Sequence, residues 1–150
     1  MLLKLPAGVS VLKAEDPGCG TLLCTAVSTG IDDETVGLLI KMGANPNTKV
    51  GRFGILLNTA CVEHKFSTIE ACLQSSLGFR VLPVKGKYGT PMQSVVDGIQ
   101  REGSESCMQA LELLEKHGII EDVPGGLHYT ALHAATRLGA PKDVVIWLAS

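Results

Sequence analysis

The stretch Thr130-Ala131-Leu132-His133-Ala134-Ala135 decides the fold, because blocks of the same pattern occur four times along the chain. The other three blocks begin at Thr21, Ile55 and Thr90, so that successive starts are 34, 35 and 40 residues apart. Self-similarity at a period of roughly 20–50 residues is the signature of repeat architectures. The sequence therefore predicts an array of similar units.

A second apolar stretch follows each block at helical spacing. These stretches cover residues 35–40, 69–73, 110–114 and 144–148. Each unit thus reads as helix, short turn, helix and long loop, with residues around 99–103 expected in such a loop. We expect one domain over residues 1–150, in which 1–15 form the tail of a preceding repeat and the units span about 16–49, 50–84, 85–124 and 125–150.

Local chemistry supports these helix positions. Thr90 and Thr130 stand where an N-cap is expected, just before the first helical residue. Acidic residues 32–34 are placed to favour a helix N-terminus, and Ser67-Thr68-Ile69-Glu70 has the pattern of a capping box that opens a second helix. Further signals are glycines placed just past helix ends and a proline at the start of the last helix: Gly43, Gly118 and Pro141.

These features resemble the ankyrin repeat, whose units of about 33 residues carry a T-P-L-H-x-A signature. Residues 130–135 depart from that signature only at the proline position, and residues 41–47 are similar to the ankyrin ending. In the middle units Asn58 and Gln93 replace the signature histidine. The resemblance covers residues 16–150. It implies an all-α, ankyrin-repeat solenoid of stacked helix-turn-helix units joined by hairpin loops.

The loops carry a narrower resemblance. Gly-basic-aromatic-Gly segments at 51–54 and 86–89, with a weaker echo at 123–129, are similar to fungal ankyrin arrays, including those that follow NACHT-type nucleotide-switch domains in large sensor proteins. These glycines match neither a phosphate-binding Walker loop nor a dinucleotide fingerprint, so we expect no nucleotide and no other cofactor. Trp147 would lie near an uncovered end, and we expect an excised piece of a longer array.

Composition excludes several classes of protein. The chain of 150 residues has a net charge of −2 and only 4% aromatic residues, which argues against nucleic-acid binding. No stretch approaches the roughly 20 apolar residues of a membrane span, and the N-terminus lacks a signal-peptide pattern. Five cysteines, an odd number, indicate reduced thiols. We expect an intracellular protein, cytoplasmic or nuclear, that binds no membrane and no small-molecule substrate.

Charge is distributed unevenly along the chain. Residues 41–87 carry seven basic and two acidic side chains, a net charge of +5, whereas residues 88–122 carry two basic and seven acidic ones, a net charge of −5. Such faces are often only solvated surface. If they are functional, they would steer a partner of mixed charge.

Catalytic and metal sites find little support. Cys61 and His64 invite a thiol-hydrolase or metal interpretation, but zinc sites need four converging ligands and a catalytic site needs more partners than these two. We expect Cys61 and Cys72 to be buried. By resemblance, His133 is structural and hydrogen-bonds between neighbouring turns. We therefore expect no enzyme and no metal.

The sequence thus favours a protein–protein interaction module that docks a partner on a concave face of hairpin tips and first helices. The alternative is a structural spacer or an intramolecular regulatory arm of a larger sensor protein. By resemblance, the contact residues in the loops are Arg52, Phe53, Lys87, Tyr88, Leu127 and His128. Those on the helices are Ser28, Thr29, Val62, Glu63, Asp97, Gly98, Arg137 and Leu138.

Overall fold

The computed structural model describes residues 15–16, 20–47, 56–75, 89–120 and 123–150. In these residues the secondary structure is helical apart from one short hairpin and an isolated antiparallel bridge between Gly125 and Tyr129, so the expected all-α class is confirmed. The strands β1 (Glu15–Asp16) and β2 (Gly20–Thr21) pair antiparallel. The helices are α2 (Leu22–Ser28), α3 (Asp33–Lys41), α4 (Leu56–Val62), α5 (Phe66–Gln74), α6 (Pro91–Asp97), α7 (Ile99–Glu102), α8 (Ser104–Lys116), α9 (Ala131–Arg137) and α10 (Lys142–Ala149).

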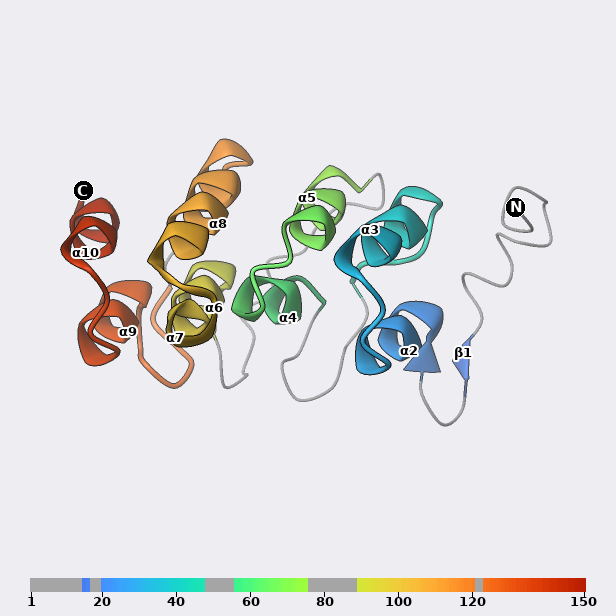
Figure 1. Ribbon diagram of the computed structural model, residues 1–150, viewed down its shortest axis with the longest axis horizontal. Helices are drawn as coiled ribbons and strands as arrows, with labels where there is room; N and C mark the ends of the chain where they lie inside the picture. The colour runs from blue at the N-terminus through green and yellow to red at the C-terminus, as the bar shows by residue number, and fades with distance from the viewer. Residues whose placement is uncertain (1–14, 17–19, 48–55, 76–88, 121–122) are drawn as a thin grey trace.

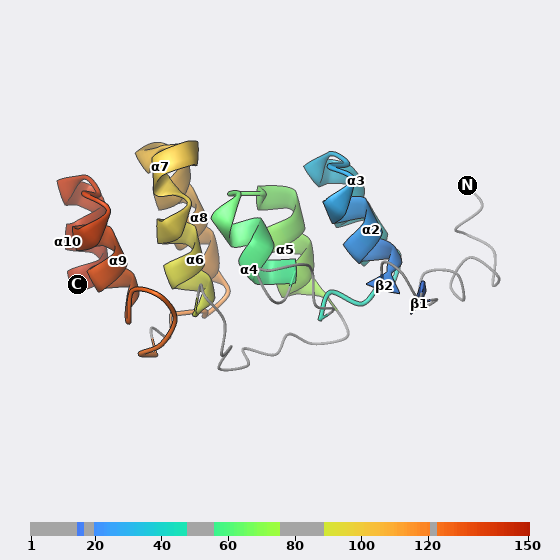
Figure 2. The ribbon, with the colours of Figure 1, turned by 90° about the horizontal axis from the view of Figure 1, so that it is seen from below.

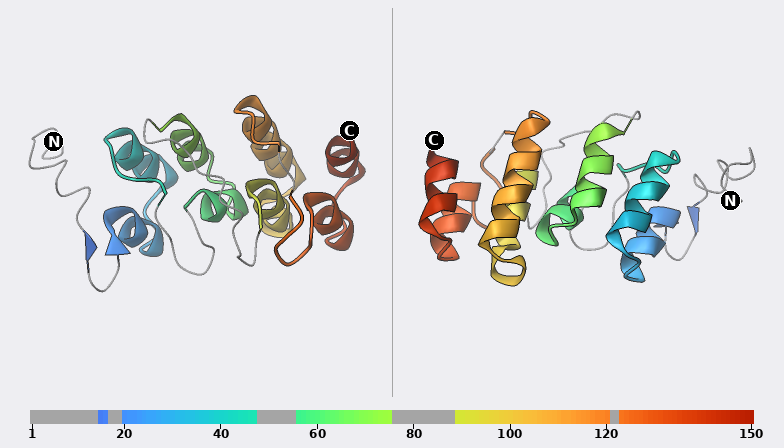
Figure 3. Two further views of the ribbon diagram at one scale, coloured as in Figure 1. Left: turned by 180° about the vertical axis from the view of Figure 1, so that it is seen from behind. Right: turned by 45° about the horizontal axis from the view of Figure 1, so that its top comes forward.

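The helices form a row of pairs in two layers (Figure 1). One layer holds α2, α4, α6 and α9, and the other holds α3, α5, α8 and α10; Figures 2 and 3 show the same order from below and from behind. We call the successive groups unit 1 (α2, α3), unit 2 (α4, α5), unit 3 (α6 to α8) and unit 4 (α9, α10). Units 2, 3 and 4 touch along the first layer, where α6 packs against both α4 and α9, whereas units 1 and 2 touch along the second layer, where α3 packs against α5.

The expected N-caps are present. The hydroxyl oxygen of Thr90 accepts a hydrogen bond from the backbone N–H of Gln93, and that of Thr130 accepts one from His133. Asp32 caps α3 through the N–H of Thr35 at 2.9 Å. These bonds satisfy N–H groups that a helix leaves without internal partners, which fixes where each helix begins.

At one helix end, a histidine occupies the position where two other units have glycine. Gly30 and Gly139 adopt left-handed backbone two residues after α2 and α9 end, with φ of 74° and 66°. At the same place after α4 the chain has His64, with φ of 48°. A side chain is strained in this region by about 1–2 kcal/mol, so tertiary contacts must hold His64 there. The glycines expected to end α3 and α8, Gly43 and Gly118, also have positive φ.

Two expectations about local structure are wrong. The capping box at 67–70 does not form, because α5 begins at Phe66 and its N-cap is Lys65. The expected loop around residues 99–103 is instead the helix α7, whose Ile99 side chain is buried. The N–H groups of Arg101 and Glu102 bond to the carbonyl of Gly98, so this turn continues directly from α6.

The core runs between the layers and through all four units. Small first-layer residues let the helices approach closely, while larger aliphatic residues of the second layer fill the space between them. Buried members include Ala60, Cys61, Val95, Val96, Ala134 and Ala135 from the first layer, and Ile69, Leu111, Leu114 and Val144 from the second. No helix in the described part of the chain combines the length and the apolarity that crossing a membrane requires.

Candidate functional site

Amide side chains connect successive units at the position of the signature histidine. Asn58 Nδ2 donates to the carbonyl of Gly89 at 2.9 Å, and Gln93 Nε2 donates to the carbonyl of Tyr129 at 3.1 Å. Each acceptor residue directly precedes the N-cap position of the next unit. The Gln93 amide also donates to Val123 at 3.0 Å. These bonds hold the backbone just before the first helix of one unit against the first helix of the unit before it.

The histidine itself behaves differently. His133 Nδ1 lies 2.7 Å from the hydroxyl of its own N-cap, Thr130, and its ring meets the edge of Tyr129 with centroids 5.5 Å apart. The expectation that His133 links neighbouring turns is therefore corrected. In the described residues, Asn58 and Gln93 make that kind of link instead.

The predicted contact residues differ in where the structure places them. Arg52, Phe53, Lys87 and Tyr88 lie outside the described residues. Glu63 and Leu138 are partly exposed, whereas Thr29, Leu127 and Arg137 are exposed. Of Ser28 the structure describes only the backbone position, at the end of α2.

Two first-helix assignments need correction. Val62 is only 1% exposed, because it is packed in the core where α4 meets unit 3. Gly98 is buried, and a side chain there would overlap with the backbone carbonyl of Val62. Neither residue can reach a partner from these positions.

Asp97 and His128, both predicted as contacts, are brought together but bind each other. His128 Nε2 lies 3.1 Å from Asp97 Oδ1, and both side chains are largely buried. Burial lowers the pKa of His128, and the nearby Arg137 cation lowers it further. His128 Nδ1 is buried and has no hydrogen-bond partner among the described residues, which also favours the neutral ring. His128 therefore donates from Nε2–H to Asp97, and this pair joins unit 3 to unit 4.

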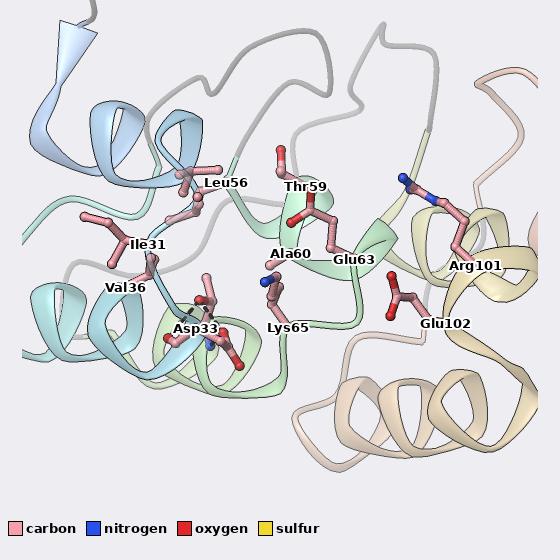
Figure 4. Close-up of a pocket in the computed structure, with 13 residues that line it drawn as sticks. Ile31, Asp33, Val36, Leu56, Thr59, Ala60, Glu63, Lys65, Arg101 and Glu102 are labelled. Carbon is pink, nitrogen blue, oxygen red and sulfur yellow. Dashed lines mark hydrogen bonds between the residues drawn. The ribbon is translucent and has the colours of Figure 1, made fainter.

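One hollow shared by several units is a groove of about 320 Å³, which we call the inner groove (Figure 4). Its apolar end is formed by Val27, Ile31, Val36 and Leu56. Its charged end is formed by Glu63, Lys65, Arg101 and Glu102. Figure 4 shows Ile31, Val36 and Leu56 to one side, Arg101 and Glu102 to the other, and Thr59 and Ala60 between them.

The groove wall contains an unsatisfied hydroxyl. Thr59 is only 3% exposed, and within the described part of the chain its Oγ1 has no hydrogen-bond partner. A buried polar atom without a partner destabilises a fold by about 1–3 kcal/mol relative to a satisfied one. Such an atom beside a hollow marks a place where a ligand group would complete the hydrogen bonding.

Asp33 fixes the shape of the groove between units 1 and 2. Its carboxylate accepts from the backbone N–H of Ser67 and of Thr68, each at 2.9 Å, and from the Thr68 hydroxyl at 2.7 Å. Asp33 therefore caps α5 from the neighbouring unit, in place of the local capping box. The contact also places the groove-lining Thr68 against α3.

A second hollow, which we call the end hollow, lies on unit 4 and has a volume of about 410 Å³. Three of the predicted contact residues line it: Leu127, His128 and Arg137. Tyr129, His133 and Thr136 complete it. The hairpin of unit 4 and one face of α9 thus form a single surface.

Three of the described cysteines, Cys61, Cys72 and Cys107, are buried in the core. Burial raises the pKa of Cys61 well above its usual value, and it raises the pKa of Cys72 and of Cys107 to about 12. The ring nitrogens of His64 contact Val95 and Ser106 rather than a thiol. Cys61 and His64 therefore do not form a thiol–imidazole pair. Within the described residues, no group of three or more His, Cys, Asp or Glu side chains is placed to hold a metal ion.

Sequence reasoning missed most of the inner groove. Ile31 and Arg101 lie in a turn and in the unexpected helix α7, and Thr59 has no motif that would single it out. The one available signal was the spacing of Leu56, Thr59, Ala60 and Glu63, which places these groove residues on one side of α4. Compared with protein-family models and with curated proteins, the sequence gives no match.

Proposed function

We propose that this chain is a non-catalytic protein–protein interaction module of the ankyrin-repeat type, which docks a segment of a partner protein in the inner groove. The family assignment is supported by paired helices in two layers, by threonine N-caps at equivalent positions, and by amide links between units at the signature position. A stacked array of this kind offers an extended, preformed surface, which limits the entropy lost on binding.

The observation that carries the proposal is the Thr59 hydroxyl, which is buried in the groove wall without a partner. The peptide backbone of a bound segment supplies both N–H and carbonyl groups, so it can satisfy a hydroxyl as donor or as acceptor. An apolar core would retain no such atom for stability alone. Thr59 is thus the central contact of the proposed docking site.

The lining indicates what kind of segment fits. Ile31 is 41% exposed at the apolar end, where an aliphatic side chain of the partner would cover it. At the other end Glu63 and Arg101 offer both signs of charge, which suits a partner of mixed charge. The bound segment is therefore an extended stretch with one aliphatic anchor and polar flanks.

Two variants and a control test the proposal. Thr59→Val replaces the hydroxyl by a methyl group, so the folded chain keeps or gains stability while partner binding weakens. Ile31→Asp places a charge in the apolar end. Leu38→Asp is the control, because Leu38 is 55% exposed on α3 and does not line the groove. Affinity capture from cell extract with quantitative mass spectrometry compares all three with the unaltered chain.

We expect at least one protein to be recovered with the unaltered chain and with Leu38→Asp, and lost with the two groove variants. Circular dichroism verifies that each variant is folded. Equal recovery by all four chains would contradict the proposal. That result would favour a spacer or an intramolecular regulatory arm.

A further inference from the structure

The end hollow sits where unit 4 presents the surface that unit 3 uses to hold a hairpin. In unit 3 this surface is occupied: Gln93 binds the carbonyls of Val123 and Tyr129, and Asp97 binds His128. In unit 4 the equivalent first-helix residues are His133 and Arg137, and both line the hollow. The two surfaces can therefore be compared residue by residue.

Unit 4 is not arranged to hold another hairpin in the same way. Gly89 and Tyr129 occupy equivalent places with similar positive φ, 59° and 75°. A side chain on Gly89 would overlap with the amide of Gln93, so the bridging position of Gln93 requires glycine there. Tyr129 has that side chain, and His133 is turned toward Thr130 and the Tyr129 ring instead. The hollow is thus suited to a different occupant.

Arg137 gives the hollow its charge. The residue is exposed in the last turn of α9, and among the described residues it takes part in no ion pair. The nearby carboxylate of Asp97 lies 3.1 Å from His128 Nε2. A guanidinium group that forms no ion pair offers up to two parallel hydrogen bonds to a carboxylate.

His133 adds a second donor. The Thr130 hydroxyl accepts from the His133 backbone N–H and also lies 2.7 Å from His133 Nδ1. When the hydroxyl donates to Nδ1, the proton of the neutral ring is on Nε2, at the edge of the ring that is not bound to Thr130. Leu127 and Tyr129 lie beside these donors, 54% and 59% exposed.

We propose that the end hollow is a second docking site, which binds an acidic segment of a partner protein: a carboxylate on Arg137 and His133, and an adjacent aliphatic side chain on Leu127 and Tyr129. The pairing follows from charge complementarity with the unpaired guanidinium and from the exposed apolar surface next to it. This site shares no residue with the inner groove, so it does not depend on the function proposed above.

The test is a titration of isotope-labelled protein, followed by amide chemical shifts. The probe is the blocked peptide Leu-Glu-Glu-Leu, and its neutral counterpart Leu-Gln-Gln-Leu is the matched control. We expect the acidic peptide to shift the signals of Leu127, Tyr129, His133 and Arg137. Affinity should fall about fivefold for the neutral peptide and also for Arg137→Gln, the effect of one exposed charge pair.

Arg101→Gln is the control variant, because Arg101 is also exposed but lines the inner groove. It should bind the acidic peptide like the unaltered chain, as should Thr59→Val. Three results would overturn the proposal. The first is that no signal shifts at peptide concentrations up to about 10 mM, which exceeds the dissociation constant of even a weak complex. The others are equal affinity for the two peptides, or shifts that Arg101→Gln abolishes. Failure of the inner-groove variants to change partner capture would leave this result untouched.

Discussion

The junction between units 2 and 3 and the junction between units 3 and 4 share one kind of amide hydrogen bond but are closed by different contacts. Both have an amide that donates to the backbone carbonyl just before the N-cap of the next unit, from Asn58 to Gly89 in one and from Gln93 to Tyr129 in the other. The first junction is then closed by His64, which is 5% exposed, and by the close approach of Gly98 to Val62. The second is closed by the Asp97–His128 pair.

The difference shows that one repeat position can hold opposite chemistry. Val62 and Asp97 each end the first helix of their unit, yet one is buried in the core and the other is bound to His128. A residue that a resemblance assigns to partner binding can thus be buried or bound within the array instead. The environment of each junction, and not its place in the repeat, decides which residues remain available.

The largest effect should come from His64, which closes the first junction. Val95 O can only accept, so His64 Nε2 donates to it at 2.8 Å, and Nδ1 then accepts from the Ser106 hydroxyl at 3.0 Å. His64→Ala removes both bonds and keeps the strained backbone, so we expect a loss of about 3 kcal/mol in the free energy of unfolding. Urea denaturation measures it.

His64→Gly sharpens this test, because glycine accepts a φ of 48° without strain. Its loss should be smaller than that of the alanine variant by about 1 kcal/mol. Equal losses would mean that the left-handed backbone is not strained and that the two bonds alone account for the effect. A loss below about 1 kcal/mol for both variants would contradict the role of His64 in stabilising the junction between units 2 and 3.

A smaller loss is expected from the close approach in the same junction. Gly98 has ordinary helical φ of −76°, so Gly98→Ala acts only through the overlap with Val62 and His64. We expect a destabilisation of about 2 kcal/mol. Gly125 is the control, since a side chain there meets nothing within 4 Å and Gly125→Ala should change stability by less than about 0.5 kcal/mol. If Gly98→Ala lost as little stability as Gly125→Ala, the close approach of Gly98 to Val62 would not contribute to stability.

The smallest effect concerns pH at the second junction. The pKa of His128 is lowered in the folded chain by burial and by Arg137, so below about pH 6.5 the unfolded chain binds more protons than the folded one. Stability should therefore fall as pH drops from 6.5 toward the folded pKa of His128. His128→Gln should flatten this part of the stability curve, as denaturation at several pH values would show.

Arg137→Gln separates the two causes, because it removes the cation and keeps the burial. The imidazole pKa, measured from ring proton shifts, should rise in this variant but stay below its usual value. An imidazole pKa above about 6.5 in the unaltered chain would contradict the assignment of a neutral ring that donates to Asp97.

Helix positions were predictable because their signals are local. Thr90 and Thr130 cap the helices that follow them, and the apolar spacing at 35–40 and 144–148 falls within α3 and α10. A cap or an apolar stripe acts within one or two turns, so the sequence near a helix is sufficient to place it. The capping box at 67–70 failed for the opposite reason, since a carboxylate from another unit provided the cap.

By itself, the sequence determined the repeat period, the all-α class and the burial of cysteines such as Cys61, because these follow from spacing and polarity along the chain. Only the tertiary structure decided the contacts that span units: Asp33 with Thr68, 35 residues away, and Asn58 with Gly89, 31 residues away. It also decided that Thr59 remains without a partner beside the inner groove. Such contacts depend on how neighbouring units are rotated and spaced, which no local pattern specifies.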